Sequence, residues 1–152
     1  MHFAYKVLSI IINMVAMLLA VSLLFSLPVL LSSPLTMLSG FMMVSIILYS
    51  WYSNKFSTKI LRQQQVVKHG LKDWVKVNGI VAIIFSLIVI VDVILLIGNP
   101  QAYVEAVKKL GVDLPEQTIT TFLYIMLAYG IILLIHVVWT LILLKKKASF
   151  FQ

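Results

Sequence analysis

The feature that most constrains the fold of this chain is its longest apolar run, residues 77–97, which reads VNGIVAIIFSLIVIVDVILLI. At about 1.5 Å per residue, a helix of this length crosses the roughly 30 Å hydrocarbon core of a bilayer. One carboxylate, Asp92, lies within the run. We therefore predict a membrane-spanning helix around which the other apolar runs pack.

Three further apolar runs have comparable length, at residues 7–27, 35–51 and 122–144. Hydrophobic residues make up 62% of the 152-residue chain and charged residues 11%, which is more apolar surface than a soluble domain of this size can bury. The first run is too long for a signal peptide and no small-residue cleavage site follows it, so we expect it to remain as a span. The sequence therefore predicts an all-α integral membrane protein, in which residues 1–152 form a single four-transmembrane-helix bundle.

The basic residues of the chain, which carries a formal net charge of +7, are distributed unevenly. Of the 12 Lys and Arg residues, one precedes the first run, six lie in the loop of residues 53–76 and three follow the last run. Membrane proteins keep such residues on the cytoplasmic side. Both termini and this loop are therefore predicted to be cytoplasmic, and residues 98–121 to form the outer loop. The apolar runs predict a multi-pass protein of the cell membrane, and the preference for Lys over Arg together with the many Ile residues favours a bacterial source, so we expect a bacterial inner membrane.

The loop of residues 53–76 presents a basic surface. Its basic residues are Lys55, Lys59, Arg62, Lys68, Lys72 and Lys76, against the single carboxylate of Asp73. Such a surface either anchors the topology or docks anionic lipid or a protein partner. In a membrane protein this charge does not indicate a nucleic-acid partner. Lys55, Lys59 and Arg62 share one helical face, so the second helix is predicted to continue to about residue 65.

One segment of the outer loop has helical periodicity, with Tyr103, Val107 and Leu110 on a face opposite Glu105 and Lys109. This pattern predicts a short amphipathic helix that lies on the outer membrane surface or covers the ends of the bundle.

Aromatic residues end the second apolar run: Tyr49, Trp51 and Tyr52. Aromatic rings at such a position are typical of the belt at the headgroup level. After the last apolar run, we expect the tail from residue 148 to be mobile.

Asp92 is the acidic side chain that the sequence places at membrane depth. A carboxylate near the middle of a spanning helix costs about 2.5–3.5 kcal/mol to insert. At about 1.5 Å per residue it lies roughly 22 Å from the inner edge, in the outer half. At this depth the fourth helix places Tyr129, and the second places Ser39 and Gly40, which are the expected hydrogen-bond partners. Asp92 is then a proton or cation site, a packing residue, or a group tilted toward outer water.

His136 is the second polar candidate at membrane depth. It lies roughly 12 Å from the inner edge, and Asn13 of the first helix lies at about 9 Å. We therefore predict a direct hydrogen bond between the two side chains. The alternative is a proton relay from His136 through Tyr129 to Asp92, whose two ends would lie about 10 Å apart in depth.

The sequence lacks the residues that several kinds of catalytic, phosphate-binding and metal site require. The chain has no Cys and no Gly-rich phosphate loop, and one His and one Asp inside the predicted spans are too few for a metal site. We therefore predict no catalytic residue, metal or cofactor.

The leading hypothesis is a small non-enzymatic scaffold, accessory or assembly subunit that binds the lipid bilayer and a membrane protein partner or copies of itself. The alternative is proton or ion translocation that uses Asp92. A third hypothesis, a membrane enzyme acting on lipid, requires polar groups clustered at one interface.

Overall fold

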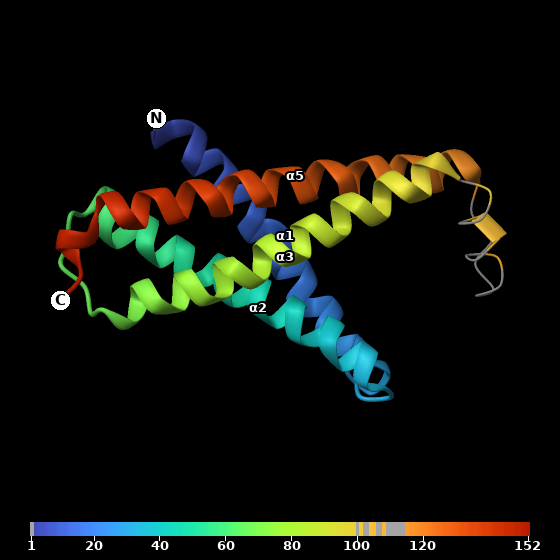
Figure 1. The fold of residues 1–152 in the computed structure, drawn as a ribbon, viewed down its shortest axis with the longest axis horizontal. Coiled ribbons are helices and arrows are strands. Elements are labelled where there is room, and N and C mark those ends of the chain that lie inside the picture. Colours follow the sequence, from blue (N-terminus) through green and yellow to red (C-terminus); the bar gives the residue numbers. More distant parts are fainter. Residues whose placement is uncertain (1, 100, 102–103, 106–107, 109–114) are drawn as a thin grey trace.

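The computed structural model describes residues 2–99, 101, 104–105, 108 and 115–152, and most of these residues are helical (Figure 1). The elements, in chain order, are α1 (His2–Leu30), α2 (Pro34–Phe56), the π-helix η1 (Ser57–Arg62), α3 (Gly70–Gly98), α5 (Glu116–Lys146) and the short 3-10 helix η2 (Ala148–Phe150). The prediction of an all-helical protein is therefore confirmed for the described residues.

Three of these helices are long and apolar enough to cross a bilayer. The qualifying segments are Phe3–Leu30, Gly70–Gly98 and Gln117–Lys146. They contain the apolar runs predicted at residues 7–27, 77–97 and 122–144. Many of their large apolar side chains are exposed, such as Phe25 at 84% and Met17 at 73%. Because lipid is the solvent that accepts such a surface, the chain is a membrane-embedded protein.

The helices are arranged as two hairpins that cross. α1 packs along α2, α3 packs along α5, and α2 also packs on α3. Figure 1 shows that the α1–α2 hairpin diverges from the α3–α5 hairpin toward the ends that lie farthest from the two termini. The N-terminus, the C-terminus and the link between η1 and α3 lie toward one end of the molecule, which also carries most of the lysines, and we call it the lysine-rich end.

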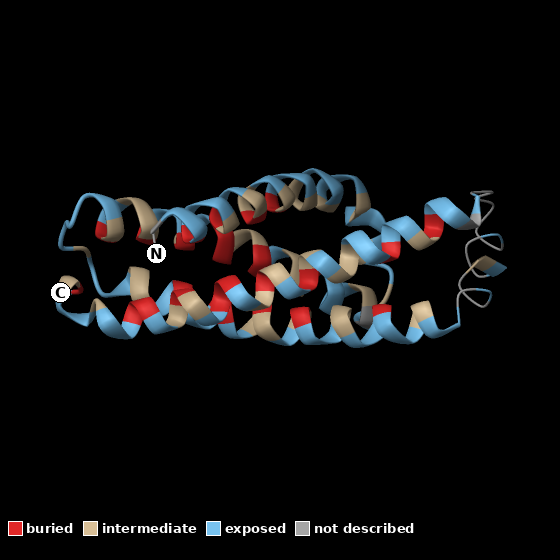
Figure 2. Cartoon of the chain, turned by 90° about the horizontal axis from the view of Figure 1, so that it is seen from above, coloured by how far each residue is buried: buried red, intermediate tan, exposed pale blue. Residues whose placement is uncertain are grey.

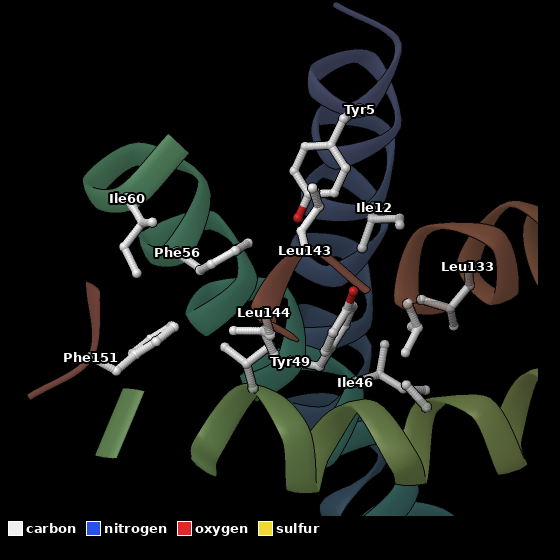
Figure 3. Packing of buried hydrophobic residues seen from close by; sticks show 13 residues of the cluster. Tyr5, Ile12, Ile46, Tyr49, Phe56, Ile60, Leu133, Leu143, Leu144 and Phe151 are labelled. Atoms are coloured by element: carbon white, nitrogen blue, oxygen red, sulfur yellow. The ribbon is translucent and has the colours of Figure 1, made fainter. Parts of the chain in front are cut away.

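The core lies where the two hairpins cross and extends to the lysine-rich end. In α1 the last buried position is Ala16, whereas Ile46, Tyr49 and Phe56 of α2 are fully buried. Figure 2 shows buried residues concentrated along the facing sides of the helices, and Figure 3 shows Tyr5 and Tyr49 entering the same apolar cluster from different helices. The crossing region is therefore the part of the bundle with a defined interior.

Glycine permits the close approach of α3 and α5. A Cβ atom at Gly130 would lie 3.1 Å from Cγ1 of Ile90, and one at Gly79 would lie 3.4 Å from Cγ1 of Val137. Small residues at helix interfaces are a common way to bring spanning helices together, because lipid provides little hydrophobic force between them. Gly130 and Gly79 thus set the spacing of this hairpin.

The C-terminal tail is ordered, so the prediction that it is mobile is wrong. The backbone amide of Val67 donates to the carbonyl of Phe150 at 2.9 Å, and the amide of Gln152 donates to the carbonyl of Val67 at 3.0 Å. Phe151 is buried and stacks on Phe56, with ring centroids 6.3 Å apart (Figure 3). The tail is held because its aromatic side chain completes the core at the lysine-rich end.

The second helix does extend beyond its apolar run. α2 continues into η1, which ends at Arg62, three residues before the predicted position. Gln64 then has a φ of 52°, which ends the helical path. The predicted amphipathic helix of the outer loop rests on Tyr103, Val107 and Leu110, which lie outside the described residues.

Candidate functional site

Three helices bring a set of polar side chains into the core. The members, which we call the His136 cluster, are Tyr5 and Ser9 of α1, Tyr49 and Ser53 of α2, and His136 and Thr140 of α5. Each is at most 8% exposed. Every pair within one helix is four residues apart, so each helix turns both of its polar side chains toward the same point. The cluster is the largest group of hydrogen-bonded side chains in the described part of the chain.

His136 uses both ring nitrogens. Nε2 lies 2.9 Å from Oγ of Ser9, and Nδ1 lies 2.8 Å from the hydroxyl oxygen of Tyr49. The imidazole also stacks on the ring of Tyr5, with centroids 4.8 Å apart and an interplanar angle of 20°. His136 therefore joins α5 to both α1 and α2.

Thr140 is the second junction of the cluster. Its hydroxyl donates to the backbone carbonyl of His136 at 2.8 Å. Its oxygen accepts from the hydroxyl of Tyr49 at 3.0 Å and from that of Tyr5 at 2.9 Å. Oγ of Ser53 lies 3.4 Å from the Tyr5 hydroxyl. Both lone pairs and the hydrogen of Thr140 are thus used, as a buried hydroxyl requires.

Counting hydrogens assigns the donor at Nδ1 of His136. The hydroxyl hydrogen of Tyr49 goes to Thr140, so the Tyr49 oxygen must accept from the Nδ1–H of His136. Nε2 of the neutral ring then accepts from Ser9. If Nε2 is instead protonated, it donates to Ser9, whose hydroxyl turns to the carbonyl of Tyr5 at 2.9 Å. The heavy-atom positions around the ring are therefore compatible with the hydrogen bonds of either form of His136.

The predicted hydrogen bond between His136 and Asn13 is wrong. Asn13 instead accepts a hydrogen bond from the hydroxyl of Ser50. His136 bonds Ser9, which lies one helical turn earlier on the same face of α1. The depth estimate treated the helices as parallel rods, whereas α1 crosses α5 at an angle (Figure 1). A crossing angle shifts which turn of one helix meets a given turn of the other.

Tyr49 was expected in the headgroup belt, and this prediction is also wrong, because Tyr49 is fully buried. Tyr52, by contrast, stacks on Trp51 on one side and on Trp74 on the other, near the lysine-rich end. The signal for the burial of Tyr49 is its spacing from Ser45 and Ser53, which lie four residues before and after it and are both buried. A polar stripe at helical spacing is typical of a face that meets other helices.

Asp92 is exposed on α3, and within the described part of the chain no hydrogen bond or ion pair engages it. The expected bond to Tyr129 is not formed: the Tyr129 hydroxyl is buried and finds no partner among the described residues. Gly40, another of the expected neighbours, packs against Leu30 of α1. For α2, the physical reason is the divergence of the hairpins, which carries the half of α2 farther from the lysine-rich end away from α3 (Figure 1).

The relay from His136 to Asp92 also lacks its middle link. It requires Tyr129 to bond a group on each side, and its hydroxyl bonds neither His136 nor Asp92. The His136 cluster and Asp92 are therefore two separate polar features, one inside the bundle and one on its surface.

The basic residues of the 53–76 segment divide into two groups. Lys55, Lys59 and Lys68 line one cavity of about 520 Å³ at the lysine-rich end. The remaining three are Arg62, which ends η1, Lys72, whose Nζ lies 5.9 Å from the ring of Phe151, and Lys76, which is exposed.

Comparison of the chain with protein-family models, with curated proteins and with solved structures finds no match. The functional argument therefore depends on the geometry of these sites.

Proposed function

We propose that this protein is a non-enzymatic assembly subunit of the membrane, and that the outer half of α3 binds a spanning helix of a partner protein. The partner helix would present a cationic side chain, Lys or Arg, at the depth of Asp92. The observation that carries this proposal is the exposure of Asp92 on a helix that is long and apolar enough to cross the bilayer.

The energetic argument rests on the cost of an exposed carboxylate. The cost is about 2.5–3.5 kcal/mol at the centre of a spanning helix, and charged side chains inside spanning segments usually face a protein partner or a water-filled cavity. The His136 cluster satisfies its polar groups within the chain, whereas Asp92 is left on the surface. A cation from another chain would offset the cost of inserting Asp92.

The surroundings of Asp92 suit a helix partner. Ile88, Val91 and Leu95 lie within one turn of it and are 43%, 54% and 67% exposed. They provide an apolar face with a single polar group, which gives a partner helix both packing contacts and a specific orientation. A second copy of this chain would present another carboxylate at this depth, so a cationic partner is the better complement.

The proposal includes four spans with both termini in the cytoplasm of a bacterial cell. α2 follows α1 through a tight turn in which Ser33 caps the helix and Pro34 begins it. At about 1.5 Å per residue, α2 is roughly 34 Å long, enough to return across the bilayer. The lysines at one end of the bundle support the cytoplasmic assignment of that end.

Cysteine crosslinking in native membranes tests the proposed contact, because the chain has no Cys of its own. A single cysteine at Val91, labelled with a photoreactive maleimide, should give an adduct of one defined mass. A cysteine at Ile125 of α5, which is 61% exposed, is the matched control and should give none. Asp92→Leu should abolish the adduct and Asp92→Glu should preserve it, and mass spectrometry of the adduct should find a span with a Lys or Arg.

Three outcomes would contradict the proposal. An adduct that persists in Asp92→Leu would show that the carboxylate does not direct the contact. An adduct between two copies of this chain would indicate self-association. The absence of any adduct at Val91 would indicate that Asp92 meets lipid or outer water.

Proton translocation is the second candidate, because Asp92 is a carboxylate exposed on a helix that is long and apolar enough to cross the bilayer. This function would use Asp92 as a surface carboxylate that lines a pore between copies. Proton flux into liposomes separates the two candidates. Translocation requires flux above background in the wild type and its loss in Asp92→Asn, whereas an assembly subunit gives background flux in both.

A further inference from the structure

The lysine-rich end contains a cavity that the assembly proposal does not use. It has a volume of about 520 Å³, and its lining includes Tyr52, Lys55, Lys59, Gln65, Lys68 and Trp74. These residues come from the end of α2, from η1, from the link after η1 and from the first turns of α3. We propose that this cavity binds the phosphate headgroup of an anionic phospholipid from the adjacent leaflet.

The charge of the cavity favours an anion. Lys55, Lys59 and Lys68 are exposed, and within the described residues none of them forms an ion pair. The carboxylate nearest in sequence is that of Asp73, which lines a neighbouring smaller cavity and lies 3.1 Å from Nδ1 of His69. Three lysines therefore line one cavity that no described carboxylate lines. Each basic residue close to an anionic membrane surface strengthens binding by about 1 kcal/mol, or roughly fivefold.

The aromatic side chains place the cavity at headgroup level. The rings of Trp51, Tyr52 and Trp74 form a stack across α2 and α3, with successive centroids 6.1 Å and 5.5 Å apart and nearly parallel planes. Trp and Tyr prefer the boundary between hydrocarbon and water. Nζ of Lys55 lies 5.2 Å from the Trp51 ring centroid, a cation–π distance that holds this ammonium group beside the stack.

The position of the cavity favours a lipid over a soluble phosphate compound. Trp74 lines it, and Val77 follows one turn later at the start of the apolar run, where it is 59% exposed. A phosphate in the cavity could therefore be attached to acyl chains that run along the exposed apolar face of α3. A soluble anion would be attracted by the lysines but would make no contact with this apolar face.

The lipid site is independent of the proposed partner contact. Trp74 lies in the first turns of α3 and Tyr52 near the end of α2, whereas Asp92 lies in the last two turns of α3. Lipid binding can therefore be lost while the Asp92-dependent adduct is retained, and the reverse also holds.

Native mass spectrometry of the purified full chain in detergent tests the site. The probe is palmitoyl-oleoyl phosphatidylglycerol, with the phosphatidylcholine of the same acyl chains as the neutral comparison. The wild type should retain one phosphatidylglycerol under conditions that remove phosphatidylcholine. The triple variant Lys55→Gln, Lys59→Gln and Lys68→Gln should bind it at least about tenfold more weakly. Far-UV circular dichroism shows whether the variant is folded, and Lys59→Glu alone replaces it if it is not.

The matched control removes the same charge outside the cavity. Lys76→Gln, Lys145→Gln and Lys146→Gln are exposed positions at the same end, and this variant should bind within about twofold of the wild type. Equal loss in both triple variants would overturn the proposal in favour of diffuse attraction. Displacement of the lipid by an equal concentration of glycerophosphoglycerol, which has the headgroup without acyl chains, would overturn it in favour of a soluble ligand.

Discussion

Replacing His136 with alanine is expected to lower the free energy of unfolding by about 3–5 kcal/mol. The variant leaves a cavity at a point where α1, α2 and α5 meet, since His136 is 1% exposed. It also removes the hydrogen bonds to Ser9 and Tyr49 and the ring stacking on Tyr5. Unfolding in detergent by added sodium dodecyl sulfate, followed by tryptophan fluorescence, measures the effect, because Trp139 contacts Tyr5 with ring centroids 5.7 Å apart.

Two further variants divide this effect into its parts. His136→Leu restores most of the volume without the hydrogen bonds, so it should lie between the wild type and His136→Ala. Ile135→Ala truncates the neighbouring residue, which is 50% exposed, and should cost less than about 1 kcal/mol. A His136→Ala protein as stable as Ile135→Ala would show that the His136 cluster does not hold the hairpins together.

The buried hydroxyls of Tyr49 and Tyr129 should respond differently to the same substitution. Tyr49→Phe removes a hydroxyl that accepts from His136 and donates to Thr140, and we expect it to cost about 1–3 kcal/mol. Tyr129→Phe removes a buried hydroxyl that has no partner among the described residues. It should leave stability unchanged or raise it by up to about 1 kcal/mol, because an unsatisfied polar group is lost.

The same unfolding measurement compares the two variants, and each serves as the control for the other because the chemical change is identical. A Tyr129→Phe protein that loses as much stability as Tyr49→Phe would contradict the separation of Tyr129 from the hydrogen-bonded network. Equal and negligible effects would indicate that the bonds of Tyr49 contribute little in the membrane.

The long helices could be predicted because the length of an apolar run can be read directly from the sequence, without knowledge of tertiary contacts. α1, α3 and α5 all contain their predicted runs. Candidates such as His136 and Asp92 could also be found, since a polar side chain inside an apolar run is visible in the sequence. The continuation of the second helix toward Arg62 was predicted from the periodic spacing of its basic residues.

The partners of these residues could not be predicted, because they depend on crossing angles between helices. Membrane depth alone predicts a bond between His136 and Asn13. Because α1 crosses α5 at an angle, Ser9 lies beside the imidazole instead. Depth paired Asp92 with Tyr129, but depth carries no information about which way a side chain points around its helix. The order of the tail after residue 147 could not be predicted, because it depends on the packing of Phe151 against Phe56, a contact between distant segments.

We propose that the lysine-rich end lies on the cytoplasmic side of the membrane and that the far ends of α3 and α5 lie on the other side. Labelling of single cysteines with a membrane-impermeant maleimide tests it most directly, in intact cells and in opened cells. We expect a cysteine at Gln65 to react after the cells are opened and not before, and a cysteine at Gln117 to react in intact cells. Labelling of both positions from the same side of the membrane would contradict the account.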